Sequence, residues 1–315
     1  MNTRQGAVRL FRFAGIDVYL HFLWFLIAIY EIQDRKGAYS SPIFNILEYL
    51  GLFLIVLMHE FGHALACKQV GGRANQIMLW PLGGIAYVDP PPRPGATLWS
   101  IAAGPLVNVA LVFVLKAMGM IWRSSGMPLN TDTFALLRTL ATINFWLLAF
   151  NLLPIYPLDG GQILRSLLWY IFGRARSLTI AAVMGLFGVA ALVYLAIQAA
   201  DPWLGVVSFF ILINCWNGLK HAWALNKIAS LPRRQEFACP SCKASPPIGA
   251  VWRCSACTNA FDTFATGAQC PVCGMKFDRT ACMDCGTLSP MSDWKQGVYV
   301  VGGTPMPTPT GPPGY

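Results

Sequence analysis

The sequence predicts an α-helical polytopic membrane protein with a small cysteine-rich domain at its C-terminal end. The membrane part is predicted by composition, because 55% of the 315 residues are hydrophobic and only 12% are charged. A soluble globular protein would carry about a quarter charged residues. The second domain is predicted by the cysteines, eight of which fall after residue 238. The formal net charge of +9 is explained by Lys and Arg gathering in cytoplasmic loops, which makes nucleic acid an unlikely partner.

Six apolar runs come close to the roughly twenty residues that a helix needs to cross a bilayer. They lie at residues 16–32, 44–69, 97–122, 134–153, 177–198 and 203–222. The first run follows three arginines and lacks a convincing small-residue cleavage site, so it is interpreted as an uncleaved span rather than a signal peptide. Basic residues after the second, fourth and sixth runs predict a multi-pass cell membrane protein with both termini in the cytoplasm.

Three segments between the runs depart from a simple transmembrane pattern. The stretch 76-QIMLWPLGGIAYV-88 has two short apolar runs around a Pro and a Gly pair, which predicts a small membrane-associated β hairpin with Gly83 and Gly84 permitting the turn. The stretch 151-NLLPIYPLDGG-161 breaks the helix at membrane depth, where irregular backbone is tolerated only inside protein or beside a wet cavity. Residues 162–176 interleave bases with apolar residues and are expected at the cytoplasmic interface.

The second apolar run contains the stretch 57-LMHEFGHALA-66. His59 and His63 are four residues apart, so a helix presents both imidazoles on one face to one metal ion. Glu60 then falls where it can reach a water at the metal without binding the metal. This division of roles is the physical basis of the zinc-protease pattern H-E-x-x-H. Histidines packed by chance are the simpler interpretation, but ionisable groups inside a membrane run are costly and usually functional.

Hydrolytic zinc sites use three protein ligands and keep one position for water. The candidates for the third ligand are His21, His221 and Asp159. Asp159 is preferred because it stands in the broken segment, which the arginine pattern places at the same cytoplasmic depth as His59. A metal transporter is a competing hypothesis, but it would distribute polar and acidic residues over several spans.

The chain resembles the site-2 protease family of intramembrane zinc metalloproteases. HEFGH at 59–63 and NLLPIYPLDGG at 151–161 match the two signature motifs of that family in order and separation. GPLVN at 104–108 resembles the family's G-P-x-x-N element, and PLGGIA at 81–86 resembles its membrane-associated hairpin. The likeness covers roughly residues 10–225.

The resemblance implies that His59, His63 and Asp159 bind a catalytic zinc ion and that Glu60 is the catalytic carboxylate. It also implies a core of three helices, the second to the fourth spans. The expected activity is hydrolysis of a peptide bond within or near the transmembrane segment of a membrane-anchored protein, as in regulated intramembrane proteolysis. No insert between the motifs is large enough for a PDZ domain, so gating must come from elsewhere.

Polar groups that stabilise the transition state are expected near the metal. Asn108 and Asn151 are predicted as such donors, although interhelical hydrogen bonding is an equally good interpretation of each. Asn144 is interpreted as a packing amide. Residues 77–88 could offer an open edge to which an unwound substrate adds as a strand, or could plug the protein against lipid.

Four C-x-x-C pairs follow one another at 239–242, 254–257, 270–273 and 282–285. Each pair can form one knuckle with two thiolates, so four pairs predict a double zinc ribbon with two structural zinc ions. Disulfides are the alternative, but a reducing cytoplasm argues against them. Cys67 and Cys215 are interpreted as packing residues. The predicted zinc ligands are Cys239, Cys242, Cys254, Cys257, Cys270, Cys273, Cys282 and Cys285.

The sequence therefore divides into a metalloprotease domain at 1–230, the ribbon at 237–290 and a disordered tail at 291–315. The ribbon has a surface of mixed charge and is interpreted as a protein-interaction or substrate-gating module. The alternative for the whole chain is a catalytically inert membrane scaffold that acts through its ribbons. Such a scaffold would be expected to lose Glu60, which is present here.

Overall fold

The computed structural model describes residues 6–35, 37–80 and 83–294. The chain separates into two compact units, one ending at Asn226 and one beginning at Lys227. The division falls inside the last long helix, a few residues before the boundary predicted at 230.

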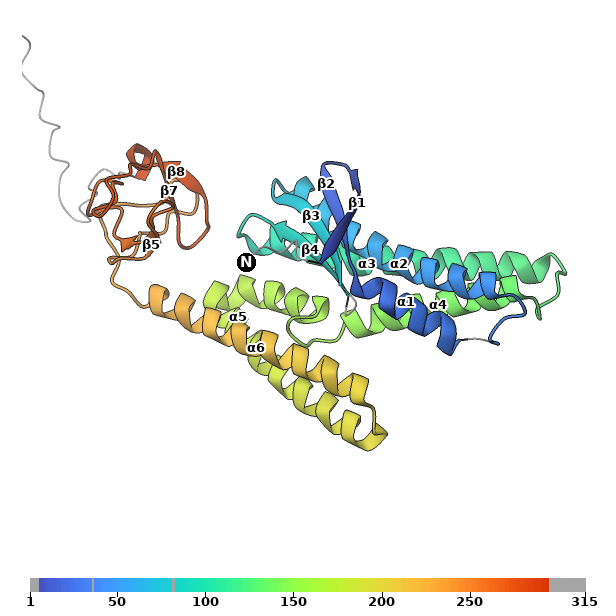
Figure 1. Cartoon of the computed structure of the whole chain (residues 1–315). Coiled ribbons are helices and arrows are strands. Elements are labelled where there is room, and N and C mark those ends of the chain that lie inside the picture. Colours follow the sequence, from blue (N-terminus) through green and yellow to red (C-terminus); the bar gives the residue numbers. More distant parts are fainter. Residues whose placement is uncertain (1–5, 36, 81–82, 295–315) are drawn as a thin grey trace, which may run out of the picture. The chain divides into compact units, whose positions relative to one another are not determined.

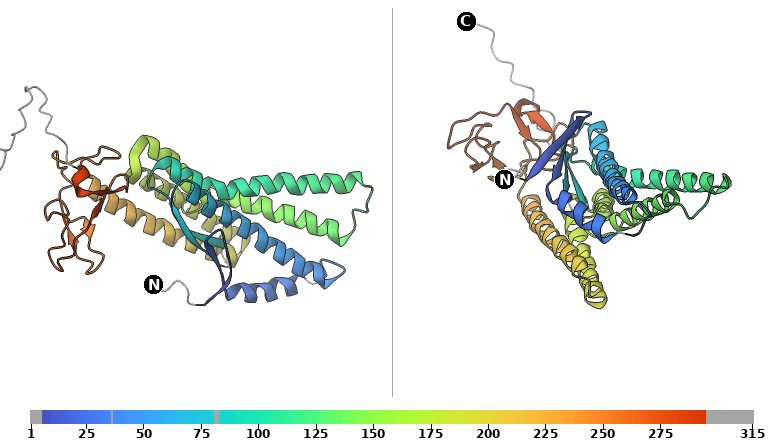
Figure 2. Two further views of the ribbon diagram at one scale, coloured as in Figure 1. Left: turned by 90° about the horizontal axis from the view of Figure 1, so that it is seen from above. Right: turned by 45° about the vertical axis from the view of Figure 1, so that its right-hand side comes forward.

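Five helices of the described chain are long and apolar enough to cross a membrane. They coincide with the last five of the six predicted spans (Figure 1). Two of them, α3 and α4, form a hairpin of antiparallel helices (Figure 2). The five are α2 (Pro42–Gln69), α3 (Pro94–Ser124), α4 (Asp132–Asn151), α5 (Asp159–Ala199) and α6 (Pro202–Ala229).

The first predicted span, 16–32, is wrong. Its beginning is the strand β2 (Ile16–His21), and its end is the helix α1 (Leu23–Asp34), which has 12 residues. At 1.5 Å per residue, α1 covers about 18 Å, well short of a hydrocarbon core of about 30 Å. The run misleads because a strand buried on both faces is as continuously apolar as a helix.

A four-stranded sheet lies beside the helices, with strand order β1-β2-β3-β4. It comprises β1 (Ala7–Phe13), β2, β3 (Arg73–Trp80) and β4 (Gly83–Asp89), and only the β2–β3 pair is parallel. The antiparallel β3–β4 pair confirms the predicted hairpin, but the hairpin is half of a larger sheet. Parallel neighbours need a crossover connection, which here consists of α1 and α2.

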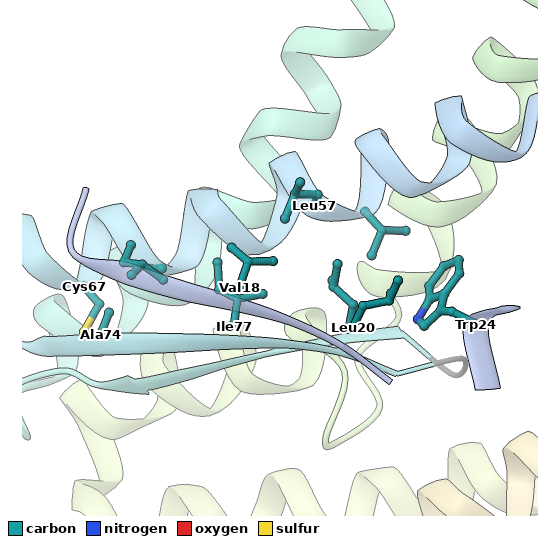
Figure 3. Close-up of a cluster of buried hydrophobic side chains, with 11 residues drawn as sticks. Val18, Leu20, Trp24, Leu57, Cys67, Ala74 and Ile77 are labelled. Carbon is teal, nitrogen blue, oxygen red and sulfur yellow. The ribbon is translucent and has the colours of Figure 1, made fainter. Parts of the chain in front are cut away.

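This crossover places α2 over one face of the sheet (Figure 3). Val18 and Leu20 of β2 and Ile77 of β3 pack with Leu57 and Cys67 of α2 in one buried apolar cluster. The packing fixes the second half of α2, which carries His59 to His63, against the strands.

The helix α5 joins two segments that were predicted as separate, 162–176 and 177–198. Gly173 interrupts the helical geometry between them with φ 76° and ψ 173°. This left-handed backbone conformation favours glycine, so the sequence provides a sharp bend without ending the helix.

The second unit contains two small two-stranded sheets. They are β5 (Trp252–Arg253) with β6 (Ala260–Phe261), and β7 (Arg279–Ala281) with β8 (Leu288–Pro290). The 3-10 helix η1 (Met291–Trp294) follows, although the tail was predicted to begin at 291. Trp294 is completely buried against Phe264, with ring centroids 5.0 Å apart, which explains why the folded domain extends this far. The rest of the predicted tail, 295–315, lies outside the described residues.

Candidate active site

Two histidines of α2 and the first residue of α5 meet inside the helical unit. Nε2 of His59 lies 3.0 Å from Nε2 of His63. Oδ2 of Asp159 lies 3.1 Å from the first nitrogen and 3.4 Å from the second. Both histidines are buried. Three potential ligand atoms thus converge on one point, as the spacing of the motif and the choice of Asp159 predicted.

The hydrogen bonds of the two imidazoles determine their protonation. Nδ1 of His59 lies 2.5 Å from the side-chain oxygen of Asn108, and Nδ1 of His63 lies 3.0 Å from the carbonyl oxygen of Ser100. Both oxygens can only accept hydrogen bonds, so both Nδ1 atoms carry the proton. Each Nε2 therefore directs a lone pair towards the shared point.

The donor set fits a zinc ion. The Nε2 lone pairs of His59 and His63 face each other, and buried Oδ2 of Asp159 has no hydrogen-bond partner in the described part of the chain. Such an arrangement is repulsive unless a cation lies between the three atoms. Tetrahedral zinc binds nitrogen and oxygen at about 2.0–2.2 Å, which puts ligand atoms about 3.3–3.6 Å apart. The observed separations of 3.0–3.4 Å are close to that range.

Close packing of α3 against α2 lets these contacts form. Gly104 faces the imidazole of His63, and a Cβ atom at this position would overlap the ring. Asn108, one turn further along α3, reaches His59, one turn earlier on α2. The GPLVN element thus supplies one residue with no side chain and one amide, each opposite a histidine.

Asp159 is positioned by the broken segment between α4 and α5. A Cβ atom on Gly160 would overlap the backbone of Leu152, and one on Gly161 would overlap the backbone of Tyr156. The two glycines therefore let the segment fold back tightly over the start of α5. The Cys215 thiol donates to the Tyr156 carbonyl at 2.8 Å, so this residue, predicted only to pack, also anchors the segment to α6.

Glu60 is buried under the strand β4. Its Oε2 accepts the backbone N–H of Ala86 at 2.9 Å. A Cβ atom on Gly84 would overlap the Glu60 side chain. Gly84 was predicted to permit a turn, but it lies within β4, where its role is to let the strand approach Glu60. Residues 81 and 82 lie outside the described residues.

The predicted transition-state donors differ in their surroundings. Asn108 uses its side-chain oxygen for His59 and its amide N–H for Oδ1 of Asn144 at 2.7 Å, while Asn144 donates back to the Asn108 carbonyl at 3.0 Å. The geometry therefore favours the interhelical interpretation of Asn108 over a donor to substrate. Asn151 is half-buried at the end of α4, and its side chain makes no hydrogen bond to the described residues. Its role stays a prediction.

The other two histidines lie outside the cluster. His21 ends β2 and stacks on Trp80 with ring centroids 4.2 Å apart, and His221 belongs to α6. Sequence reasoning missed the backbone contributions of Ser100 and Ala86. Main-chain groups have no signature in a sequence, so no local signal could have found them.

In the second unit the four cysteine pairs combine in a nested order. The first pair joins the fourth, and the second joins the third. Sulfur atoms of partner pairs are 3.5–3.7 Å apart, far longer than a disulfide bond of about 2.05 Å. Four thiolates around zinc at about 2.3 Å would be about 3.8 Å apart, so both groups have suitable spacing. The groups are Cys239, Cys242, Cys282 and Cys285, and Cys254, Cys257, Cys270 and Cys273.

Comparison with known proteins gives a consistent result for the helical unit. The model of Peptidase family M50 matches residues 48–124 and 115–195. The solved structure of the site-2 protease from Methanocaldococcus jannaschii is 31% identical, with a TM-score of 0.52, over 68% of this chain and 95% of that one.

Curated relatives match the same region. A zinc metalloprotease of Methanocaldococcus jannaschii is 35% identical over 57% of this chain and 50% of its own length. Stage IV sporulation protein FB of Bacillus subtilis is 32% identical over 47% of this chain and 46% of its own length. The chain thus spans about half the length of these two curated relatives.

The apolar helices and the buried donor set are the features of a multi-pass membrane protein with a site that can hold a metal ion. Within this class, the chain belongs to Peptidase family M50, the family of the site-2 proteases.

Proposed function

We propose that the chain is an intramembrane zinc endopeptidase that hydrolyses a peptide bond within or near the transmembrane segment of a membrane-anchored protein. One observation carries the proposal. Both imidazoles are held in the tautomer that directs Nε2 to a shared point with Asp159, and the carboxylate of Glu60 lies one residue after the first of them. A group of histidines that only packed would not need two separate acceptors to set the same tautomer.

The residues divide the chemistry between them. His59, His63 and Asp159 would hold the zinc ion, which when bound polarises the peptide carbonyl and activates water. Glu60 would accept the proton of the attacking water and return it to the leaving amine. Asn108 and Ser100 keep the imidazoles oriented, as hydrogen-bond partners of metal-binding histidines usually do.

The open edge of strand β4 is suited to pairing with a substrate in an extended conformation. Among the described strands, β4 pairs only with β3, so its other edge is open. The N–H of Ala86 points from that edge to Glu60. An unwound substrate that adds to this edge as a strand would bring its backbone to the carboxylate and would compete with it for the Ala86 N–H.

The cysteine groups are proposed to hold two structural zinc ions. The buried core of this unit is small, and four of its buried residues are cysteines. Metal binding would therefore contribute much of the folding free energy of this unit. We further propose cytoplasmic termini, an active site near the cytoplasmic side, a role in regulated intramembrane proteolysis, and a protein-binding or gating role for the ribbon.

The test compares Glu60→Gln with the wild-type protein on a transmembrane-segment peptide in detergent. The carboxylate moves protons without holding zinc, so the variant should lose cleavage and keep its zinc content. Glu48→Gln removes another buried carboxylate from the same helix, twelve residues earlier, and serves as the matched control. Normal cleavage by Glu60→Gln would refute the protease and favour the inert scaffold.

A further inference from the structure

The bend in α5 brings two arginines onto one indole ring. The guanidinium carbon of Arg165 lies 6.0 Å from the ring centroid of Trp169, and that of Arg174 lies 5.8 Å from the same centroid. In an unbroken helix these arginines, nine residues apart, would be separated by about 13.5 Å along the axis. The left-handed conformation of Gly173 changes the direction of the chain immediately before Arg174.

A third basic side chain joins them from α6. His221 is within electrostatic range of both Arg165 and Arg174. The two helices are held together nearby, where the Asn226 amide donates to the hydroxyl of Thr179 at 3.3 Å. The cluster therefore lies beside a contact between α5 and α6, with His221 exposed and both arginines half-buried.

No carboxylate of the described chain compensates the charge of Arg165. Its Nε is buried and has no hydrogen-bond partner, and no carboxylate lies within 4.0 Å of the guanidinium among the described residues. Arg165 and Arg174 also repel each other. Buried guanidinium donors normally meet an acceptor, so this part of the helical unit favours an anionic ligand.

The arrangement of the donors in the cluster favours one kind of anion over another. A guanidinium presents its donors as a planar fork that matches carboxylate or phosphate. A carboxylate has two oxygens and matches one fork, whereas the oxygens of a tetrahedral phosphate can accept from two forks and an imidazole. The indole of Trp169 restricts both arginines before the anion arrives, which lowers the entropy lost on binding.

We propose that Arg165, Arg174 and His221 form a binding site for a phosphate group. The group comes from an anionic phospholipid headgroup or from free phosphate, and apolar α5 residues that follow Arg174 offer a surface for acyl chains. The site is separate from the zinc ligands, but Arg165 lies in the same helical segment as Asp159. Bound phosphate would thus stabilise the segment that carries the third zinc ligand.

The experiment uses full-length protein reconstituted with phosphatidylcholine and phosphatidylglycerol, followed by native mass spectrometry of the lipids retained in detergent. Wild-type protein should retain phosphatidylglycerol preferentially. Arg165→Gln and Arg174→Gln should each weaken retention about tenfold, the effect of one charge-assisted hydrogen bond. Arg176→Gln, which removes an exposed charge two residues after Arg174, should retain the lipid as the wild type does. Zinc content shows that each variant is folded.

A second arm adds inorganic phosphate to the purified protein. Displacement of phosphatidylglycerol by phosphate would support the site with a soluble source, and resistance to phosphate would support the lipid source. Equal losses in Arg165→Gln and Arg176→Gln would show attraction by general surface charge and would overturn the proposal. Unchanged retention in both Arg165→Gln and Arg174→Gln would overturn it as well.

Discussion

The side-chain oxygen of Asn108 lies 2.5 Å from Nδ1 of His59, so an amide on α3 sets the proton on an imidazole of α2. The same amide donates to Asn144 on α4, and Asn144 donates back to the Asn108 carbonyl. This chain of hydrogen bonds is buried and connects the three central helices. The orientation of His59 is therefore coupled to the packing of all three.

Replacement of Asn108 by Leu should weaken zinc binding at the helical site by about 10- to 100-fold, because His59 loses the acceptor that fixes its tautomer. Competition with a chelator measures the affinity. Asn214→Leu is the control, since among the described residues the Asn214 amide donates only to the Phe210 carbonyl of its own helix. An unchanged affinity in Asn108→Leu would show that His59 does not depend on this contact.

Replacement of Gly84 by Ala should reduce peptide cleavage about a hundredfold and leave the zinc content unchanged. The added methyl group would overlap the Glu60 side chain, so either the carboxylate or β4 must shift. Gly119→Ala is the control, because a Cβ atom there meets no other atom within 4 Å. Kinetics and zinc analysis on the same samples separate the two effects. Loss of zinc in Gly84→Ala would instead place the damage at the ligands.

The nested cysteine groups predict a pattern of zinc loss. The double variant Cys239→Ser and Cys285→Ser removes two ligands of one group, so one zinc ion should be lost. The double variant Cys239→Ser and Cys254→Ser affects both groups, so two should be lost. Metal analysis of purified protein counts the ions. Two ions lost in the first variant would contradict the nested pairing.

The carboxylate of Asp262 connects three parts of the second unit. It accepts the Arg234 side chain at 2.7 Å and the backbone N–H groups of Gly249, Phe264 and Ala265. Burial alone would raise the pKa of Asp262, but the hydrogen bonds, above all that from Arg234, hold it below its ordinary value. Removal of the charge should therefore destabilise the unit at neutral pH.

For Asp262→Asn we expect a loss of about 1–3 kcal/mol in the free energy of unfolding, the usual effect of breaking hydrogen bonds to a charged group, which here is half-buried. Denaturant unfolding of the zinc-loaded protein measures it. Asp278→Asn removes an exposed carboxylate from the same domain and should change stability little. Equal stability of the two variants would show that the Asp262 contacts contribute nothing.

Several features followed from the sequence because they are local. The spacing of His59 and His63 places both on one helix face whatever the rest of the chain does. The glycines and prolines of 151–161 end a helix by their own backbone preferences. This break in the helix identified Asp159 as the candidate ligand. Five long apolar runs were also predicted correctly as helices, because the length and composition of a run are local properties of the sequence.

Other features depended on which elements meet. Ile16 to His21 begin a mostly apolar run that continues into α1, and pairing with β1 and β3 makes them a strand. Asn108 became a partner of His59 because α3 packs closely enough at Gly104 to bring the amide into reach. Four cysteine pairs allow several combinations, and the fold of the chain selected the nested one.

The sequence by itself determined the kind of chemistry, because metal ligands and the carboxylate beside them are side chains with recognisable spacing. The tertiary structure alone decided what surrounds them. The Ser100 carbonyl and the Ala86 N–H belong to groups that every non-proline residue carries, so only the three-dimensional path of the backbone brings them to His63 and Glu60. The positions of Arg165 and Arg174 on Trp169 likewise arise only after α5 bends at Gly173.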